Sequence, residues 1–172
     1  SNRYLRIHLA GADYLLPGNA YVIEQRANLV AAQPGDFPVV AWRVLPSGRC
    51  PAYSLGREFK PQPPGDWTVA VFLETVPRPI GLTSAEAQLL TRTGIHVEPF
   101  TPPGRPPTRA GHLFKAAWVE DARPLLVFEP AALVAYLASD VAGFLTGQTI
   151  LIDGWLTIVS PLHRPADDLS SR

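Results

Sequence analysis

The stretch from Ala41 to Phe59, AWRVLPSGRCPAYSLGREF, decides the fold that the sequence predicts. Its composition predicts two short strands, Val39 to Leu45 and Arg49 to Leu55, with the turn Pro46-Ser47-Gly48 between them. Proline presets one backbone dihedral, and glycine accepts the positive φ that a hairpin loop often needs. The stretch therefore predicts a β-hairpin that ends at Gly56.

Two interpretations of this hairpin stay open. A strand with one solvent face carries a polar residue at every second position, so the hairpin can be core and nothing more. Arginine and aromatic residues are also enriched where proteins bind one another, and Arg43 stands beside Trp42 in this strand. On the second interpretation the candidate partner-binding residues are Arg43, Val44, Gly48 and Arg49.

Composition favours one mainly β protein of ordinary size. The chain has 172 residues, 47% of them hydrophobic, and its 19 prolines disfavour long helices. Fifteen basic and fifteen acidic residues balance, so nothing indicates nucleic acid or an anionic membrane as a partner. A single cysteine and the absence of a long apolar run lead us to expect a cytoplasmic protein without membrane insertion.

Further strands and helices are expected on both sides of the opening hairpin. Arg3 to Leu16 predicts another hairpin, and Ala20 to Leu29 is compatible with a strand or a helical turn. Strands are also predicted at Trp67–Glu74, Ile80–Leu82, Ile95–Phe100, His112–Glu120 and Pro124–Phe128. Short helices are predicted at Ala85–Leu90, capped by Ser84, and at Ala131–Leu137 after Pro130.

No catalytic, cofactor or metal site is predicted. The histidines are too far apart in sequence for a compact metal site: His8, His96, His112 and His163. Neither a nucleophile elbow nor a phosphate-binding glycine loop is present. Cys50 lies inside the hairpin next to Pro51, where a buried apolar role is expected for its side chain.

Residues 3–138 resemble the CheW-like domain, the adaptor fold of bacterial chemotaxis and pilus-control systems. The resemblance rests on the order of four stretches: YLRIHLAGADYLLP from Tyr4, the opening hairpin, WTVAVFLETVPRPIGL from Trp67, and GHLFKAAWVEDARPLLVFEPAALVAYL from Gly111. It departs from the family pattern at the central turn, which has no Asn-Leu-Arg-Gly run, and at Ser54-Leu55, where the family usually has Asp-Leu.

The resemblance implies two intertwined five-stranded β-barrels and no catalysis. It also implies two partners, the cytoplasmic tip of a chemoreceptor and the regulatory domain of a histidine kinase. These would bind exposed apolar strand faces and the groove between the barrels. The function expected from it is a signalling adaptor, possible also in pilus or twitching-motility control.

The C-terminal part, residues 139–172, is expected to be an extension beyond a domain at 1–138. Leu137 to Trp155, LASDVAGFLTGQTILIDGW, resembles the C-terminal segment of short-chain dehydrogenases. No dinucleotide loop accompanies it, and no tyrosine is followed four positions later by lysine. An exposed apolar strand invites pairing, so Thr149–Ile152 or Leu156–Val159 should pack on the domain or on a second copy, while 162–172 is loosely held.

Three functions remain open on the sequence. The first is the signalling adaptor, the second a fragment or fusion related to a short-chain dehydrogenase without a complete active site. The third is a ligand-binding β module, which a large pocket would favour.

Overall fold

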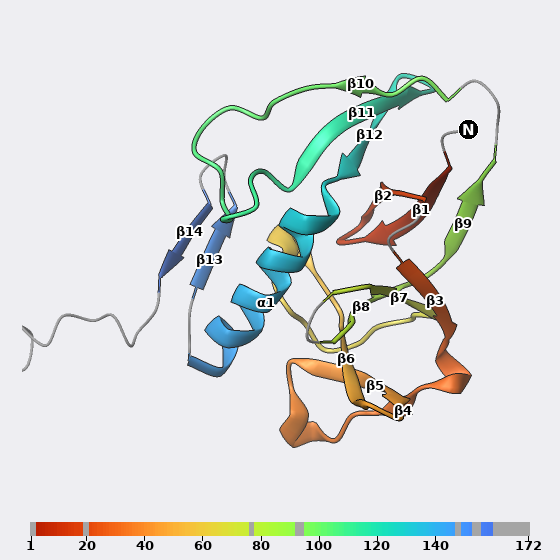
Figure 1. Cartoon of the computed structure of the whole chain (residues 1–172), viewed down its shortest axis with the longest axis vertical. Coiled ribbons are helices and arrows are strands. Elements are labelled where there is room, and N and C mark those ends of the chain that lie inside the picture. Colours follow the sequence, from red (N-terminus) through yellow and green to blue (C-terminus); the bar gives the residue numbers. More distant parts are fainter. Residues whose placement is uncertain are drawn as a thin grey trace, which may run out of the picture.

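The computed structural model describes residues 3–18, 21–75, 78–91, 95–146, 149–152 and 156–159. Its main body consists of two six-stranded sheets and one α-helix, with the first sheet in the upper part of Figure 1 and the second in the lower part. The prediction of a mainly β fold with two β subdomains is confirmed.

The first sheet has the strand order β10-β11-β12-β2-β1-β9. Its strands are β1 (Tyr4–Leu9), β2 (Ala12–Pro17), β9 (Ala87–Leu90), β10 (Glu98–Pro99), β11 (Phe114–Glu120) and β12 (Arg123–Phe128). Neighbouring strands are antiparallel except for β12 and β2, which run parallel. The chain therefore joins its first hairpin to its last one in a single sheet.

The second sheet has the order β3-β7-β8-β6-β5-β4. Its strands are β3 (Tyr21–Gln25), β4 (Val30–Ala31), β5 (Val39–Leu45), β6 (Gly48–Tyr53), β7 (Val69–Leu73) and β8 (Ile80–Ser84). Here β6 and β8 are the parallel pair. Each sheet has six strands, whereas the resemblance implied five, because a two-residue strand, β4 or β10, extends one edge of each.

The two sheets have the same topology. The strands form two successive units, β1 to β6 and β7 to β12. Each strand of the first unit has the same position in its sheet as the corresponding strand of the second unit has in the other sheet. The burial pattern of β6 is identical to that of β12, and the bulge in β5 after Val39 recurs in β11 after Phe114. Each unit, however, places its first hairpin in the sheet completed by the other unit, so the sheets exchange their hairpins.

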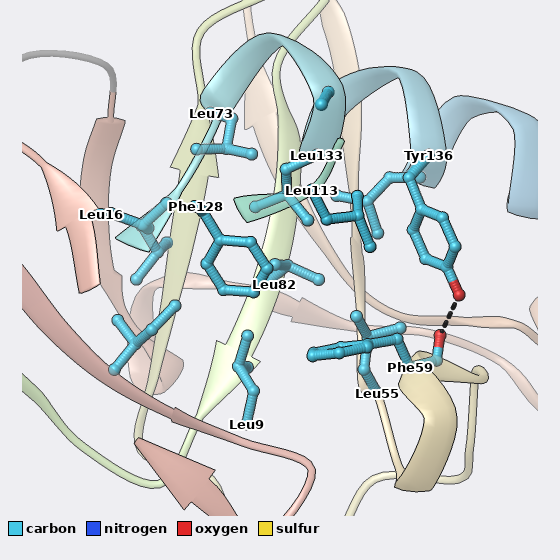
Figure 2. Close-up of a cluster of buried hydrophobic side chains, with 14 of the residues drawn as sticks. Leu9, Leu16, Leu55, Phe59, Leu73, Leu82, Leu113, Phe128, Leu133 and Tyr136 are labelled. Carbon is cyan, nitrogen blue, oxygen red and sulfur yellow. Dashed lines mark hydrogen bonds between the residues drawn. The ribbon is translucent and has the colours of Figure 1, made fainter. Parts of the chain in front are cut away.

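Three clusters of buried side chains hold this arrangement together. The largest lies between the exchanged hairpins and α1 (Pro130–Thr146), as Figure 2 shows for Leu9, Leu73 and Leu133. Each sheet adds a smaller cluster of its own, one around Phe72 and one around Val127. All five residues of β7 are buried because its alternate side chains serve two clusters.

Close packing explains one glycine of the second sheet. A Cβ at Gly81 would lie 2.6 Å from the ring of Phe72, too close for any larger residue without displacing that ring. Phe72 itself is fully buried in the cluster of the second sheet.

Local expectations from the sequence are confirmed in part. The hairpins at Arg3–Leu16, Ala41–Phe59 and His112–Phe128 form as β1–β2, β5–β6 and β11–β12. The segment at 20–29 contains both of the alternatives left open, β3 followed by the 3-10 turn η1 (Arg26–Asn28). Two more 3-10 turns are η2 (Pro34–Asp36) and η3 (Arg57–Phe59).

The predicted helix at Ala85–Leu90 is wrong, because this segment contains β9, which pairs with β1. Ser84 does not cap a helix. Its Oγ accepts a hydrogen bond from the His8 backbone N–H at 2.9 Å and so joins the end of β8 to β1. The strand predicted at Ile95–Phe100 is reduced to the two residues of β10.

The C-terminal helix is longer than predicted, since α1 continues past Leu137 to Thr146. After it, β13 (Thr149–Ile152) and β14 (Leu156–Val159) pair antiparallel in a separate two-stranded sheet. The backbone of β13 also lies against η3 and α1, so this strand contacts the main body. The expectation that 162–172 is loosely held falls outside the described residues.

Candidate functional site

The β5–β6 hairpin divides the predicted partner-binding residues between its two faces. Val44 lies directly opposite Arg49 in the antiparallel ladder, and Arg43 lies opposite Cys50. Since successive residues of a strand point to opposite faces, Val44 and Arg49 share one face while Arg43 is on the other. Cys50 is 1% exposed, so the face that carries Arg43 is the one turned to the core.

The outer face of the hairpin is apolar with one cation, and we call it the Val44 surface: Val30, Trp42, Val44, Arg49 and Pro51. Val44 is 60% exposed, and Val30 on the neighbouring β4 is 54% exposed. The Arg49 guanidinium lies 4.5 Å from the centre of the Trp42 ring, in a cation–π contact. This contact fixes a positive charge beside exposed apolar side chains, a combination typical of protein-binding surfaces.

Arg43 is engaged within the domain. Its Nε donates a hydrogen bond to Oε1 of Glu24 at 3.0 Å, and its guanidinium lies 5.5 Å from the centre of the Phe72 ring. The side chains of Arg43 and Glu24 are 17% and 24% exposed. Arg43 therefore links β5 to β3 across the inner side of the sheet instead of extending beside Arg49.

Gly48 begins β6 directly after the turn and has φ +131. This backbone conformation favours glycine. Space is not the reason for glycine here, because no atom beyond its chain neighbours lies within 4 Å of the position that a Cβ would take. Gly48 consequently shapes the turn of the hairpin.

The equivalent hairpin of the first sheet carries a matching exposed valine, which the sequence alone did not single out. Val119 in β11 is 65% exposed and pairs with Pro124 as Val44 pairs with Arg49. The signal that could have found it is the alignment of VVAWRVL at 39–45 with FKAAWVE at 114–120. The two strands agree there at Ala41/Ala116 and Val44/Val119.

A cluster of charges joins the first hairpin to β11. The Arg6 guanidinium binds Oδ2 of Asp13 at 2.6 Å and Oε2 of Glu120 at 2.8 Å. Nδ1 of His8 lies 2.8 Å from Oδ1 of the same Asp13. Burial raises the pKa of Asp13, but the hydrogen bonds from His8 and Arg6 and their charges outweigh it, so this pKa lies below its ordinary value.

The same contacts act on Arg6. Its pKa is raised chiefly by the hydrogen bond to Asp13, with smaller contributions from Glu120, against the opposing effect of burial. Arg6 thus binds both carboxylates, Asp13 and Glu120, as a fully charged guanidinium, which stabilises the exchanged hairpin in its sheet.

Among the residues that the structure describes, no group of three or more histidine, cysteine or acidic side chains is arranged to hold a metal ion. None of the described helices has both the length and the apolar character needed to span a membrane. Cys50 is buried in the cluster of the second sheet, as expected.

The chain is similar to known proteins in a short stretch of its sequence and in its fold. No model of a known protein family matches the chain. A segment of 39 residues is 51% identical to the 1-cyclohexenylcarbonyl-CoA reductase of Streptomyces collinus, and it spans 23% of this chain and 14% of that protein. Its short length fits the limited dehydrogenase resemblance seen in the sequence.

The fold is similar to that of the scaffolding protein TtCheW from Thermoanaerobacter tengcongensis, in its crystal structure. The TM-score is 0.49 with 14% sequence identity, over 74% of this chain and 88% of that one.

Proposed function

We propose that this protein is a noncatalytic adaptor of the CheW-like kind, which couples a chemoreceptor to a histidine kinase. The observation that carries the proposal is the exchange of hairpins between two sheets of equal topology. The sequence resemblance implies two intertwined barrels, and an exchange of this kind is how two sheets of one chain become intertwined. Action in the cytoplasm, and in pilus or twitching-motility control, belongs to the same proposal.

The Val44 surface supports the adaptor role. An adaptor must offer an accessible face that loses solvent on binding, and Val44 provides exposed apolar area while Arg49, held against Trp42, provides charge. The exposed end of β5–β6 is therefore the proposed contact with the kinase regulatory domain or the receptor tip. Arg43 would act behind this face, by holding β5 on β3.

Binding of the full chain to the regulatory domain of a histidine kinase from the same organism tests the proposal. Val44→Glu places a charge in the centre of the contact, so we expect the dissociation constant to increase at least about tenfold. Val119→Glu is the matched control, because it makes the same change at the equivalent exposed position of the other sheet. Absence of binding by the unaltered chain to both kinase and receptor tip would refute the adaptor.

The second candidate is a fragment or fusion related to a short-chain dehydrogenase, which the 39-residue match favours. Because the chain spans 14% of that reductase, the reductase activity does not transfer from the match. Titration with NADPH separates the two candidates: the adaptor should leave nicotinamide fluorescence unchanged, whereas a dinucleotide-binding fragment would enhance it.

A further inference from the structure

Arg49, the cation of the Val44 surface, is held at two points. Its guanidinium lies 4.5 Å from the centre of the Trp42 ring. Its backbone carbonyl oxygen accepts a hydrogen bond from Nη1 of Arg78 at 3.0 Å. Neither contact neutralises the positive charge, and no carboxylate of the described residues forms an ion pair with Arg49. The guanidinium is therefore fixed in direction while its charge remains available to an anionic group.

The Trp42 ring is itself oriented by a residue outside the hairpin. Nε1 of Trp42 donates a hydrogen bond to Oδ2 of Asp36 at 3.3 Å. Asp36 ends η2, the 3-10 turn in the connection between β4 and β5. The same Oδ2 accepts a hydrogen bond from the Gln33 backbone N–H at 3.0 Å, and the Asp36 backbone N–H donates to the Gln33 carbonyl oxygen at 2.9 Å. The turn therefore holds the carboxylate in place, and the carboxylate holds the indole.

Charge also connects the two ends of this series, Asp36, Trp42 and Arg49. The hydrogen bond from the Gln33 backbone lowers the pKa of Asp36 most, followed by the bond from Trp42; burial opposes them, and the positive charge of Arg49 adds to them. Asp36 is therefore ionised at neutral pH, and its charge attracts the Arg49 guanidinium toward the ring that lies between them.

We propose that Arg49 pairs with a carboxylate of the kinase regulatory domain, and that Asp36 is the positioning residue that holds Arg49 for this contact through Trp42. This pairing rests on the proposed function, since it names the group that the Val44 surface recognises. An acid is indicated because two guanidinium groups, those of Arg49 and Arg78, lie side by side here, while the neighbouring Asp36 already accepts two hydrogen bonds. A guanidinium held in one orientation also loses less side-chain entropy on binding.

Binding of the full chain to the kinase regulatory domain at several salt concentrations tests the pairing. Arg49→Gln removes the charge, so we expect the dissociation constant to increase about tenfold and to depend less on salt. Arg105→Gln is the matched control, because Arg105 is an exposed arginine outside the Val44 surface, and it should bind as the unaltered chain does. An unchanged dissociation constant and salt dependence in Arg49→Gln would overturn the pairing and leave the adaptor role standing.

A double-mutant cycle tests whether Asp36 acts through Arg49. Asp36→Ala removes the acceptor of the Trp42 N–H, and we expect the dissociation constant to increase about threefold. In the Arg49→Gln background the same change should have no effect, because no guanidinium is left to hold. A purely structural role of Asp36 in η2 would weaken binding equally in both backgrounds, which would overturn the positioning role. Asp66→Ala, at an exposed aspartate outside the Val44 surface, is the control and should bind normally.

NMR of the unbound protein tests the positioning role without a partner. The Arg49 guanidinium lies over the Trp42 ring, whose ring current shifts the signals of the neighbouring side-chain protons. Asp36→Ala should move these signals toward their positions in Trp42→Ala, whereas Asp36→Asn, whose amide oxygen still accepts from the indole, should keep most of the shift. Unchanged signals in Asp36→Ala would exclude the positioning role. If the unaltered chain does not bind the kinase regulatory domain, the pairing fails with the proposed contact, while these signals still decide the positioning role.

Discussion

The hydroxyl of Tyr136 donates a hydrogen bond to the carbonyl oxygen of Phe59 across 2.8 Å, which ties α1 to η3 (Figure 2). Tyr136 is fully buried, and Phe59 has a positive φ of 55 that a non-glycine residue rarely adopts. The bond therefore holds an unfavourable backbone conformation in place at the joint between the helix and the second sheet.

Tyr136→Phe removes this bond and keeps the ring, so the free energy of unfolding should fall by about 1–3 kcal/mol because a buried carbonyl loses its partner. Urea denaturation measures the change. Tyr14→Phe is the control, since Tyr14 packs on Phe59 in the same aromatic cluster but makes no hydroxyl hydrogen bond with a described residue. Equal effects of the two variants would contradict the prediction.

Arg43→Glu should destabilise the protein, although the position lies in a hairpin with an exposed face. The variant brings a carboxylate beside Glu24 in a setting where both side chains are largely buried, so we expect a loss of about 2 kcal/mol. Adding Glu24→Arg restores an ion pair and should recover part of that stability. A double-mutant cycle by urea denaturation measures the coupling, and additive effects would exclude it.

Stability should decrease in acid through Asp13. Its folded-state pKa lies below the ordinary value of 3.8, so the ionised form contributes stability that is complete above that value and is lost as pH falls through the folded-state pKa. Urea midpoints between about pH 5 and pH 2 should therefore fall less steeply in Asp13→Asn. Asp121→Asn should leave the slope as it is, because Asp121 forms no ion pair with a described residue.

We propose that residues 1–138 fold without 139–172. Among the α1 side chains whose burial the structure describes, those in the central cluster end at Leu137, so removal of 139–172 keeps them. Circular dichroism and urea denaturation should show a folded, cooperative protein after the deletion. Size-exclusion chromatography of both forms tests whether the extension mediates association of copies. Complete unfolding of the shortened chain would refute a separable extension.

The sequence predicts the hairpins well because their signals are local. Pro46 and Gly48 mark one turn and the pair Asp121-Ala122 another, and each adjoins apolar runs whose length suits strands. The sequence did not predict which hairpins join which sheet. That choice depends on pairs such as Leu126 with Tyr14, far apart in the chain, which no short window contains.

Tertiary pairing also explains the wrong helix prediction and the separation of Arg43 from Arg49. Ala87–Leu90 has ordinary helix-forming residues but becomes a strand because β1 offers it an unpaired edge. Arg43 was grouped with Arg49 because both flank one turn, but the register places them on opposite faces. A shift of the pairing by one residue would have placed both side chains on one face, and the sequence of a single strand does not fix that register.

The exchange of hairpins also bears on how the protein emerges from a ribosome. β2 can complete its parallel contact with β12 only after residue 128 has been synthesised, so the first hairpin must wait for nearly the whole main body. Pairing between such distant segments slows folding, since a long loop has to close first. Until then the apolar face of β1 and β2 stays uncovered, and such transiently exposed apolar surface favours aggregation of the nascent chain.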